Sequence, residues 1–311
     1  MSLTVVGSIA FDAVETPAGK RDRLLGGAAV HFALASSFLA ETRVVGPVGD
    51  DFGDAEYEVL RSRGVVTDDI EHVPGGKTFF WSGRYQRDVN IRDTLQTDLN
   101  VFEHFEPKLS EASRAAETLF LANIQPDLQR AVREQCDQAR FSALDSMNLW
   151  IDIAHDSLVR TIRLVDCVVL NDAELKELTD EPNLVRAARE VLELGPRIVV
   201  AKQGEYGAAM FTREGFFGLP AYPVEDVVDP TGAGDSFAGG FMGFIAAHAD
   251  EELSGELLRR AMAYGTALAS FNVEAFGTER MQTLTAAEVT DRVAELQRIT
   301  RFEDVPIALR A

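Results

Sequence analysis

A chain of 311 residues with 46% apolar side chains is long enough to bury a sizeable core in one large α/β domain with an appendage. Its net charge of −20 repels DNA, RNA and anionic lipid, and it has no run of about twenty apolar residues, so we expect neither a nucleic-acid nor a membrane partner. The two cysteines, Cys136 and Cys167, form no CxxC pair and no cluster with the five histidines, which argues against a disulfide framework or a zinc site and favours a reducing cytoplasm.

The first elements predicted along the chain are a strand, a helix and a second strand. The short apolar run 4–10 predicts a strand, and nothing at the start of the chain looks like a signal peptide, so we expect a cytoplasmic protein. After Gly26 and Gly27, an alanine-rich apolar segment predicts a helix over 28–39. The β-branched segment 42–48 predicts the second strand.

Residues 73–105 have a different pattern from the rest of the chain. Side chains alternate along 78–85, with Phe79 and Trp81 on one face and Phe80 on the other, as in a strand. A polar segment follows, and the region lacks a regular succession of strands and helices. We therefore expect a small β appendage here.

From residue 119 onward, short apolar strands alternate with helical patterns. The strands are predicted at 119–121, 141–144, 166–170 and 197–201. The helices are predicted at 127–139, 155–164, 172–179, 184–194, 237–247, 252–271 and 286–300. This alternation predicts a mainly parallel sheet with helices on both faces, in which ligands bind at the carboxyl ends of the strands.

The segment 229–240, DPTGAGDSFAGG, is the strongest functional signal in the chain. Gly232, Ala233 and Gly234 let the backbone pass close to a ligand, and the free N–H groups of a helix start favour an anion such as phosphate. Asp235 would repel a static anion, but it suits a base that accepts the proton of a hydroxyl attacking that phosphate. The alternative is a glycine-rich turn into a core helix, with Asp235 as an ordinary first-turn acid.

Several motifs together resemble those of the ribokinase (PfkB) family of small-molecule kinases. They are the di-glycine 26–27, the segment VGPVGDDFG at 45–53, NDAE at 171–174, KQGEYGA at 202–208 and DPTGAGD at 229–235. They occur in the family's order over almost the full chain. The resemblance implies a single domain over 1–311 with the three-layer α/β/α sandwich of ribokinase, a mainly parallel central sheet, and a small β lid from segments 11–25 and 73–105.

The resemblance implies an ATP-dependent phosphotransferase acting on a hydroxyl of a small sugar, polyol or nucleoside. Asp235 would be the general base, and the turn from Gly232 through Ala233 and Gly234 would form the anion hole for the transferring phosphoryl group. The alternative is a catalytically silent nucleotide or polyol sensor, which has no need of a base. A dehydrogenase is disfavoured because no GxGxxG follows the first predicted strand. The family's lids permit a monomer or a lid-mediated homodimer.

The nucleotide side follows from the same resemblance. Asn171 and Glu174 would organise Mg²⁺ and the phosphates of ATP, Glu174 largely through water; the alternative is a helix cap followed by an exposed acid. Lys202 could reach the ATP phosphates, or could be a solvated lysine at a strand end. Gly204 and Gly207 would shape the loop beside the nucleotide.

Three further positions are implied by the resemblance alone. Gly277 is assigned to the nucleotide pocket by its position. Asp229 and Thr231 match positions that hold a monovalent cation in some members, so activation by K⁺ is a possible property.

On the substrate side, the resemblance assigns the acceptor site to Asp12, Gly26, Gly27, His31 and Asn123. A carboxylate that accepts two hydroxyl hydrogen bonds would anchor a polyol; the alternative for Asp12 is an acid facing water. The chain has His31 where ribokinases have an asparagine, so the ribose-specific pattern is broken. His31 could bond another hydroxyl or a base, or simply pack.

Ala10 also replaces a sugar-binding asparagine of the family. The aromatic residues Phe11, Phe79 and Trp81 could line a more apolar pocket suited to a nucleoside or cyclitol, or could be packed surface. A set of basic residues in the lid region could contact an anionic sugar or be solvated: Arg84, Arg87 and Arg92.

Overall fold

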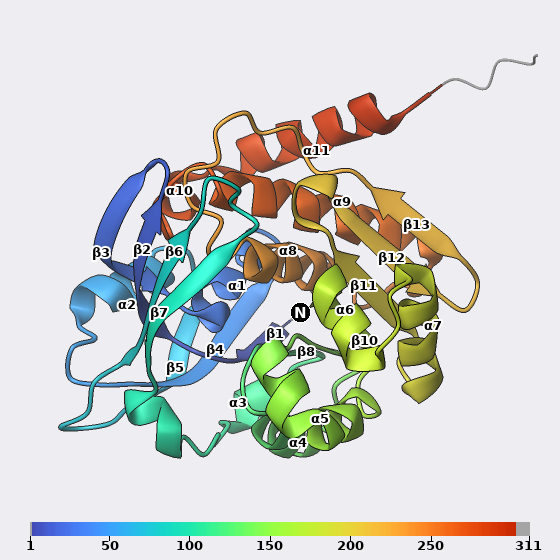
Figure 1. The fold of residues 1–311 in the computed structure, drawn as a ribbon. Helices are drawn as coiled ribbons and strands as arrows, with labels where there is room; N and C mark the ends of the chain where they lie inside the picture. Colours follow the sequence, from blue (N-terminus) through green and yellow to red (C-terminus); the bar gives the residue numbers. More distant parts are fainter. Residues whose placement is uncertain (1, 303–311) are drawn as a thin grey trace, which may run out of the picture.

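The computed structural model describes residues 2–302 and contains one large and one small sheet (Figure 1). The large sheet has nine strands in the order β13-β12-β11-β10-β9-β8-β1-β4-β5. The strands are β1 (Ser2–Val6), β4 (Glu41–Val48), β5 (Val66–His72), β8 (Thr118–Leu121), β9 (Phe141–Leu144), β10 (Cys167–Asn171), β11 (Ile198–Lys202), β12 (Ala208–Thr212) and β13 (Phe216–Leu219). All neighbours from β11 to β5 are parallel, whereas β12 pairs antiparallel with both β11 and β13, so β12 alone runs opposite to the other strands. The predicted mainly parallel sheet is confirmed.

Helices cover both faces of the large sheet, as the alternating pattern predicts. One face is covered by α1 (Ala28–Ser36), α2 (Asp54–Arg61), α8 (Ala233–Ala247) and α9 (Gly255–Asn272), against which α10 (Glu279–Thr283) and α11 (Ala286–Thr300) pack. The other face is covered by α4 (Pro126–Gln135), α5 (Asn148–Ile162), α6 (Asp172–Thr179) and α7 (Leu184–Leu194). Successive strand residues enter opposite cores: Val5 lies in the first and Val6 in the second.

Helix α8 is buried along most of its length because small residues let it approach its neighbours. A Cβ atom on Gly239 would come within 2.3 Å of the carbonyl oxygen of Phe32 in α1. One on Gly240 would come within 2.7 Å of the carbonyl oxygen of Tyr264 in α9. The glycines therefore allow α8 to pack between α1 and α9.

The small sheet contains β3 (Gly19–Gly26), β2 (Ala10–Thr16), β6 (Phe79–Tyr85) and β7 (Arg92–Asp98), in that spatial order. Its two hairpins are antiparallel, whereas β2 and β6 pair in parallel. Its strands fall within the two segments expected to form the β lid, 11–25 and 73–105. The exceptions are Ala10 and Gly26, which lie one residue outside either end of the first segment. A cluster of Val14, Leu24, Tyr85 and Phe276 anchors it to the rest of the protein.

Some predicted boundaries are wrong. The run 4–10 is not one strand: β1 ends at Val6, and Ala10 opens β2 of the small sheet. Between them the chain passes so close to the sheet that a Cβ on Gly7 would lie 2.7 Å from the Cβ of Ala122. Because Ile9 is also fully buried, the apolar run continues across a break that hydrophobicity does not reveal.

Two helices begin earlier than predicted. Helix α5 begins at Asn148 rather than at 155 and is kinked at Ala154. Helix α8 begins at Ala233 rather than at 237, so the small residues of the turn form its first turn. No helix within residues 2–302 is both long and apolar enough to cross a membrane.

Candidate active site

The carboxyl ends of adjacent parallel strands bring distant motifs together. Lys202 ends β11 and pairs in register with Asn171, which ends β10. Asp145 directly follows β9, the next strand in the sheet. Since parallel strands all end at the same edge, these side chains share one site with the first turn of α8.

The first turn of α8 has the geometry of an anion site. Gly232 caps it with a φ of +76°, a conformation that favours glycine. The amide of Ala233 donates to the carbonyl oxygen of Pro230 at 3.2 Å, so it is already engaged. The amides of Gly234 and Asp235 donate to no other residue in the described part of the chain, as expected at a helix start.

The side chain of Asp235 is partly buried in this site. Burial raises its pKa to about 7, helped by the negative charge of Asp145 and opposed by Lys202, by its own amide and by Arg92. A carboxyl group with this pKa is available as a base near neutral pH. The structure thus disfavours the interpretation of Asp235 as an ordinary exposed first-turn acid.

Lys202 is held in a nearly buried ion pair. Its Nζ lies 2.8 Å from Oδ2 of Asp145, and the two side chains are 16% and 6% exposed. Burial opposes the charge on Lys202, but Asp145, Glu174 and Asp235 outweigh burial and raise its pKa. A Cβ on Gly234 would come within 3.0 Å of Nζ, so the ammonium group lies beside the first turn of α8. Lys202 is not a solvated strand-end lysine.

The NxxE motif forms a reciprocal cap at the start of α6. Oδ1 of Asn171 accepts from the amide of Glu174 at 2.7 Å, and Oε2 of Glu174 accepts from the amide of Asn171 at 2.8 Å. Glu174 is only 7% exposed. Burial and Asp145 raise its pKa to about 7, partly offset by Lys202. The cap is present, but the acid is buried beside the cluster rather than exposed.

Gln129, which sequence reasoning missed, fixes the strand ends around Asp145. Its Nε2 donates to the carbonyl oxygens of Leu121, Ala122 and Asp145 at 3.2, 3.0 and 2.8 Å. The Gln129 side chain is fully buried in α4. Its position on the apolar face of the predicted helix 127–139 was the only sequence feature that could have marked Gln129 as a buried polar residue.

Asp12 lies in β2 of the small sheet, apart from the cluster around Lys202. It is 6% exposed, and burial raises its pKa to about 7, with Asp229 and Asp235 adding to the effect and the amide of Gly27 opposing it. A Cβ on Gly26 would lie 2.0 Å from Oδ2 of Asp12. The glycine is therefore required for Asp12 to occupy this place, and Asp12 does not face bulk water.

His31 packs beneath the turn that precedes α8. A Cβ on Gly232 would lie 2.3 Å from its ring, which is 1% exposed. Nδ1 of His31 lies 3.0 Å from Oδ1 of Asn272, which also accepts from Oγ of Ser236 at 3.0 Å. Nδ2 of Asn272 donates to the carbonyl oxygen of Thr231 at 2.7 Å. Asn272, another residue that sequence reasoning missed, thus joins His31 to the turn.

The protonation state of His31 follows from these contacts. Burial lowers its pKa, against the opposing effects of Asp229 and Asn272, so the ring is neutral. Because Oδ1 of an amide only accepts, Nδ1 carries the proton. Nε2 is then an acceptor, and it has no partner among the residues described.

Asp229 holds two loops together. Its fully buried carboxylate accepts from the amides of Thr231 and Gly277, both at 2.9 Å. Gly277 also packs against Leu24 of β3, which places it beside this turn and the small sheet. No group of three or more His, Cys, Asp or Glu residues within 2–302 is arranged to hold a metal ion.

Asn123 and the two glycines of the loop after β11 are the remaining residues that the sequence predicted for the site. Oδ1 of Asn123 accepts from Nε1 of Trp150 at 3.0 Å, and its Nδ2 lies 3.1 Å from Sδ of Met147, so its amide links β8 to α5. Gly204 and Gly207 have φ values of +55° and +95°, which explains the need for glycine in the tight loop 203–207.

The aromatic residues differ in exposure. Phe11 is 4% exposed and packs against Phe52 with ring centroids 6.1 Å apart, so it belongs to the core. Phe79 packs against Phe102 at 5.9 Å. Trp81 is half-buried and pairs with Asp12 in the register of β2 and β6. Of these three aromatic residues, Trp81 is therefore the one that lies beside Asp12.

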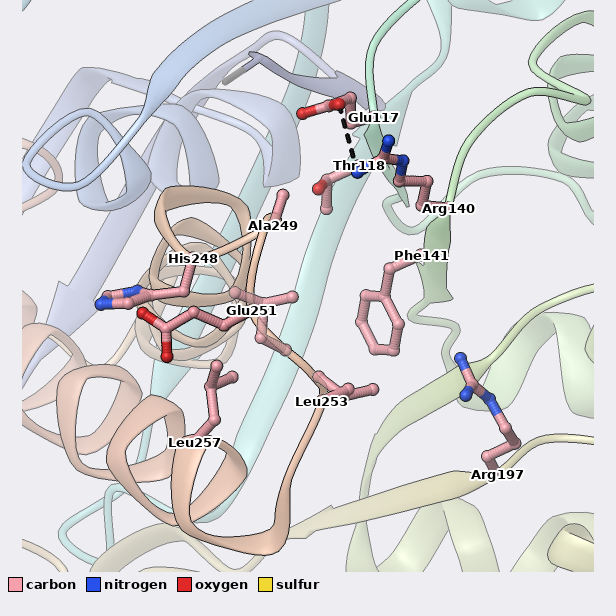
Figure 2. Close-up of a pocket in the computed structure, with 11 residues that line it drawn as sticks. Glu117, Thr118, Arg140, Phe141, Arg197, His248, Ala249, Glu251, Leu253 and Leu257 are labelled. Atoms are coloured by element: carbon pink, nitrogen blue, oxygen red, sulfur yellow. Dashed lines mark ion pairs between the residues drawn. The ribbon is translucent and has the colours of Figure 1, made fainter.

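Two cavities lie away from this site, at the amino ends of the strands. The smaller, about 120 Å³, is lined by residues such as Thr118 and Phe141, which begin β8 and β9; Figure 2 shows it, with the ion pair of Glu117 and Arg140 at its rim. The larger, about 550 Å³, adjoins Ile198 at the start of β11. Neither is lined by a predicted site residue.

A model of the pfkB family of carbohydrate kinases matches residues 2–284. The chain belongs to this family. A cytidine kinase of Thermococcus kodakarensis is 27% identical over 248 residues, which cover 78% of this chain and 87% of that protein. A nucleoside kinase of Methanothermobacter thermautotrophicus is 28% identical over 315 residues, which cover 89% and 91%.

The fold agrees with solved structures of the family. The nucleoside kinase of Methanocaldococcus jannaschii, described as an archaeal member of the ribokinase family, superposes with a TM-score of 0.77. The match covers 94% of this chain and 98% of that one at 21% sequence identity. The predicted three-layer ribokinase-like fold is thereby confirmed, and the chain is a PfkB-family kinase.

Proposed function

We propose that this PfkB-family kinase transfers the terminal phosphoryl group of ATP to a hydroxyl of a nucleoside or sugar, with Asp235 as general base. The supporting observation is the carboxylate of Asp235, whose pKa is about 7, in the first turn of α8 beside two unpartnered amides. Such a group can take up the proton of a hydroxyl as its oxygen attacks phosphorus. Phosphoryl transfer otherwise requires mainly positioning and neutralisation of charge.

The donors around Asp235 would stabilise the charge on the transferring group. The amides of Gly234 and Asp235 point from the start of α8, and the amide of Ala233 is shared with Pro230. Lys202 lies beside the same turn, oriented by Asp145. We expect the helix start and the ammonium group to act together on the phosphates of ATP, while Gly204 and Gly207 shape the nucleotide loop.

The acidic residues near Lys202 form no preformed metal site within residues 2–302, so Mg²⁺ would enter bound to the phosphates of ATP. Asp145, Glu174 and Asp235 surround one ammonium group, and this excess negative charge contributes to the raised pKa values of Glu174 and Asp235. Mg²⁺ prefers oxygen ligands and keeps several waters. Glu174 would hold it largely through water, because one of its oxygens already accepts from Asn171. The bound ion would neutralise charge on the phosphates.

A K⁺ ion beside Asp229 and Thr231 remains part of the proposal. Both carboxylate oxygens of Asp229 already accept an amide, so an ion would share them rather than fill a vacant ligand set. We expect at most moderate activation. Equal activity in K⁺ and in a large organic cation would contradict it.

The acceptor would bind between the small sheet and α8. Asp12 would accept hydroxyl hydrogen bonds, Gly26 leaves room for its carboxylate, and Gly27 packs closely against Ser8. His31, whose ring is buried, would support the turn beside the acceptor. Trp81 lies next to Asp12 in the sheet register, where it suits the base of a nucleoside. The cytidine and nucleoside kinases among the relatives support a nucleoside.

An acceptor panel tests this proposal. ADP release would be measured with ATP, Mg²⁺ and each of cytidine, adenosine, inosine, ribose, fructose and inositol. We expect turnover with at least one nucleoside at lower KM than with any free sugar. Nucleotide binding without turnover on any acceptor would instead indicate a silent binding protein.

A further inference from the structure

The β6–β7 hairpin, residues 86–91, connects the small sheet to both sides of the proposed phosphate site. Tyr85 ends β6, and its hydroxyl accepts from Oγ1 of Thr231 at 3.0 Å, in the turn before α8. Near the hairpin tip, Oδ1 of Asn90 would lie 2.8 Å from a Cβ on Gly204, in the loop after β11. The hairpin therefore contacts the anion-binding turn and the nucleotide loop together.

Arg92 begins β7 immediately after this hairpin. It pairs with Tyr85 in the strand register, and its guanidinium carbon lies 5.3 Å from the ring centroid of Trp81. Trp81 in turn pairs with Asp12. These contacts place the guanidinium group on the side of the small sheet that bears the acceptor anchor.

The charge of Arg92 acts on three separate parts of the site. Burial raises the pKa values of Asp12, Glu174 and Asp235, and Arg92 opposes that rise in each of them. These carboxyl groups lie in the small sheet, at the start of α6 and in the first turn of α8. The effect of Arg92 on them agrees with the strand register and the contact with Trp81, which place its guanidinium group on this side of the small sheet.

The two other arginines of β6 and the β6–β7 loop are differently placed. Arg84 forms an ion pair with Glu15, with Nε 3.0 Å from Oε1, on an exposed part of the small sheet. Arg87 is exposed, as is Arg92, but unlike Arg92 it is not among the main influences on the three raised pKa values, and no aromatic ring in the described part of the chain lies beneath its guanidinium group. Within residues 2–302, Arg92 has no carboxylate oxygen within 4.0 Å, so it keeps donors for a ligand.

We propose that Arg92 donates hydrogen bonds to a phosphoryl group bound at the first turn of α8 and so completes the active site from the small sheet. The inference rests on the proposed function. A guanidinium group presents paired donors that match phosphoryl oxygens, and its stacking on Trp81 helps to orient it. The phosphoryl group is either the transferring group of ATP or a phosphate carried by the acceptor. Arg92 forms no covalent bond in this role.

The test compares Arg92→Met with Arg87→Met, which removes the same charge from the same hairpin, and with Arg92→Lys. The values of kcat and KM are measured with a neutral acceptor and with ribose 1-phosphate. If Arg92 binds the transferring group, kcat falls about 100-fold or more with every accepted substrate in Arg92→Met and less in Arg92→Lys. If it binds an acceptor phosphate, only KM for ribose 1-phosphate rises, by about tenfold or more.

Calorimetry gives a readout that needs no turnover. Affinities are measured for ADP, a non-hydrolysable ATP analogue and ribose 1-phosphate. Arg92→Met should weaken binding of the analogue or of ribose 1-phosphate, while affinity for ADP and the unfolding temperature match Arg87→Met. Equal affinities and equal kinetics in Arg92→Met and Arg87→Met would overturn the proposal. If the wild-type protein itself turned over none of the acceptors, that result would count against the proposed function and not against the role of Arg92.

Discussion

The ammonium group of Lys202 lies 2.8 Å from Oδ2 of Asp145, and both side chains are largely removed from solvent. The pair links the ends of β11 and β9, on either side of β10. It also places a positive charge between Glu174 and Asp235, whose pKa values it lowers against the effect of burial. Lys202 therefore balances the charge of the cluster as well as facing the proposed phosphate site.

Replacing Lys202 with methionine should destabilise the protein. The change leaves Asp145 buried without its partner, which typically costs about 3–5 kcal/mol. Lys176→Met is the matched control, because Lys176 pairs with Asp172 at 2.8 Å on the surface and such pairs contribute at most about 1 kcal/mol. Urea unfolding would measure both. Equal losses of unfolding free energy in the two variants would show that the Lys202–Asp145 pair is not effectively buried.

Gly232→Ala should disrupt the turn at the start of α8. The new Cβ would meet the His31 ring at 2.3 Å and require a positive φ of a residue that disfavours it. Gly64→Ala isolates the second effect, since Gly64 has a φ of +74° with nothing within 4 Å. We expect kcat to collapse only in Gly232→Ala, and a larger loss of stability there than in Gly64→Ala.

The coupling to His31 can be measured directly. His31→Ala makes room beneath the turn, so the double variant Gly232→Ala/His31→Ala should be more stable than the sum of the single changes predicts. Additive effects would mean that the ring does not determine the position of Gly232.

Catalysis should increase with pH through the neutral range. The base must be deprotonated, and burial raises the pKa of Asp235 to about 7. We expect kcat/KM to rise between about pH 6 and 8 and then level off. A rate that is constant down to pH 5 would argue against a base with this pKa.

Stability should change in the opposite direction. Asp12, Glu174 and Asp235 each have a folded pKa of about 7, above the unfolded value near 4. Between these values the folded state binds more protons, so the ligand-free protein loses stability as pH rises from about 4 to 7. Thermal unfolding in that range should show the decline, and Asp12→Asn should make it less steep. The same slope in Asp12→Asn would contradict the raised pKa of Asp12.

The sequence was most informative where function depends on local motifs. The turn 229–235 and the NxxE segment are contiguous, and their carboxylates and glycines are recognisable without a structure. A helix start was expected near Asp235, but the apolar range predicted for the helix began only at 237, because Gly234 has low helix propensity and tertiary packing overrides it. The alternating pattern predicted the parallel sheet because buried parallel strands are short and apolar.

Residues that act over long sequence distances could not be predicted in this way. Asn272 bonds to Thr231 and His31, which precede it by 41 and 241 positions. Gln129 ties together the ends of two strands, and only the fold distinguishes Arg92, which lies over Trp81, from the other two basic residues named in the lid region. Nothing in their local sequence distinguishes them from other polar residues on helices or exposed strands. Only the fold brings their partners within reach.

The turnover number of Asp235→Asn tests most directly whether this carboxylate is the general base. We expect kcat to fall at least about 100-fold while the affinity for ATP analogues and the fold are retained. Glu256→Gln, a change of an exposed first-turn acid in α9, should leave kcat unchanged. A kcat for Asp235→Asn within about threefold of the wild-type value would contradict the assignment.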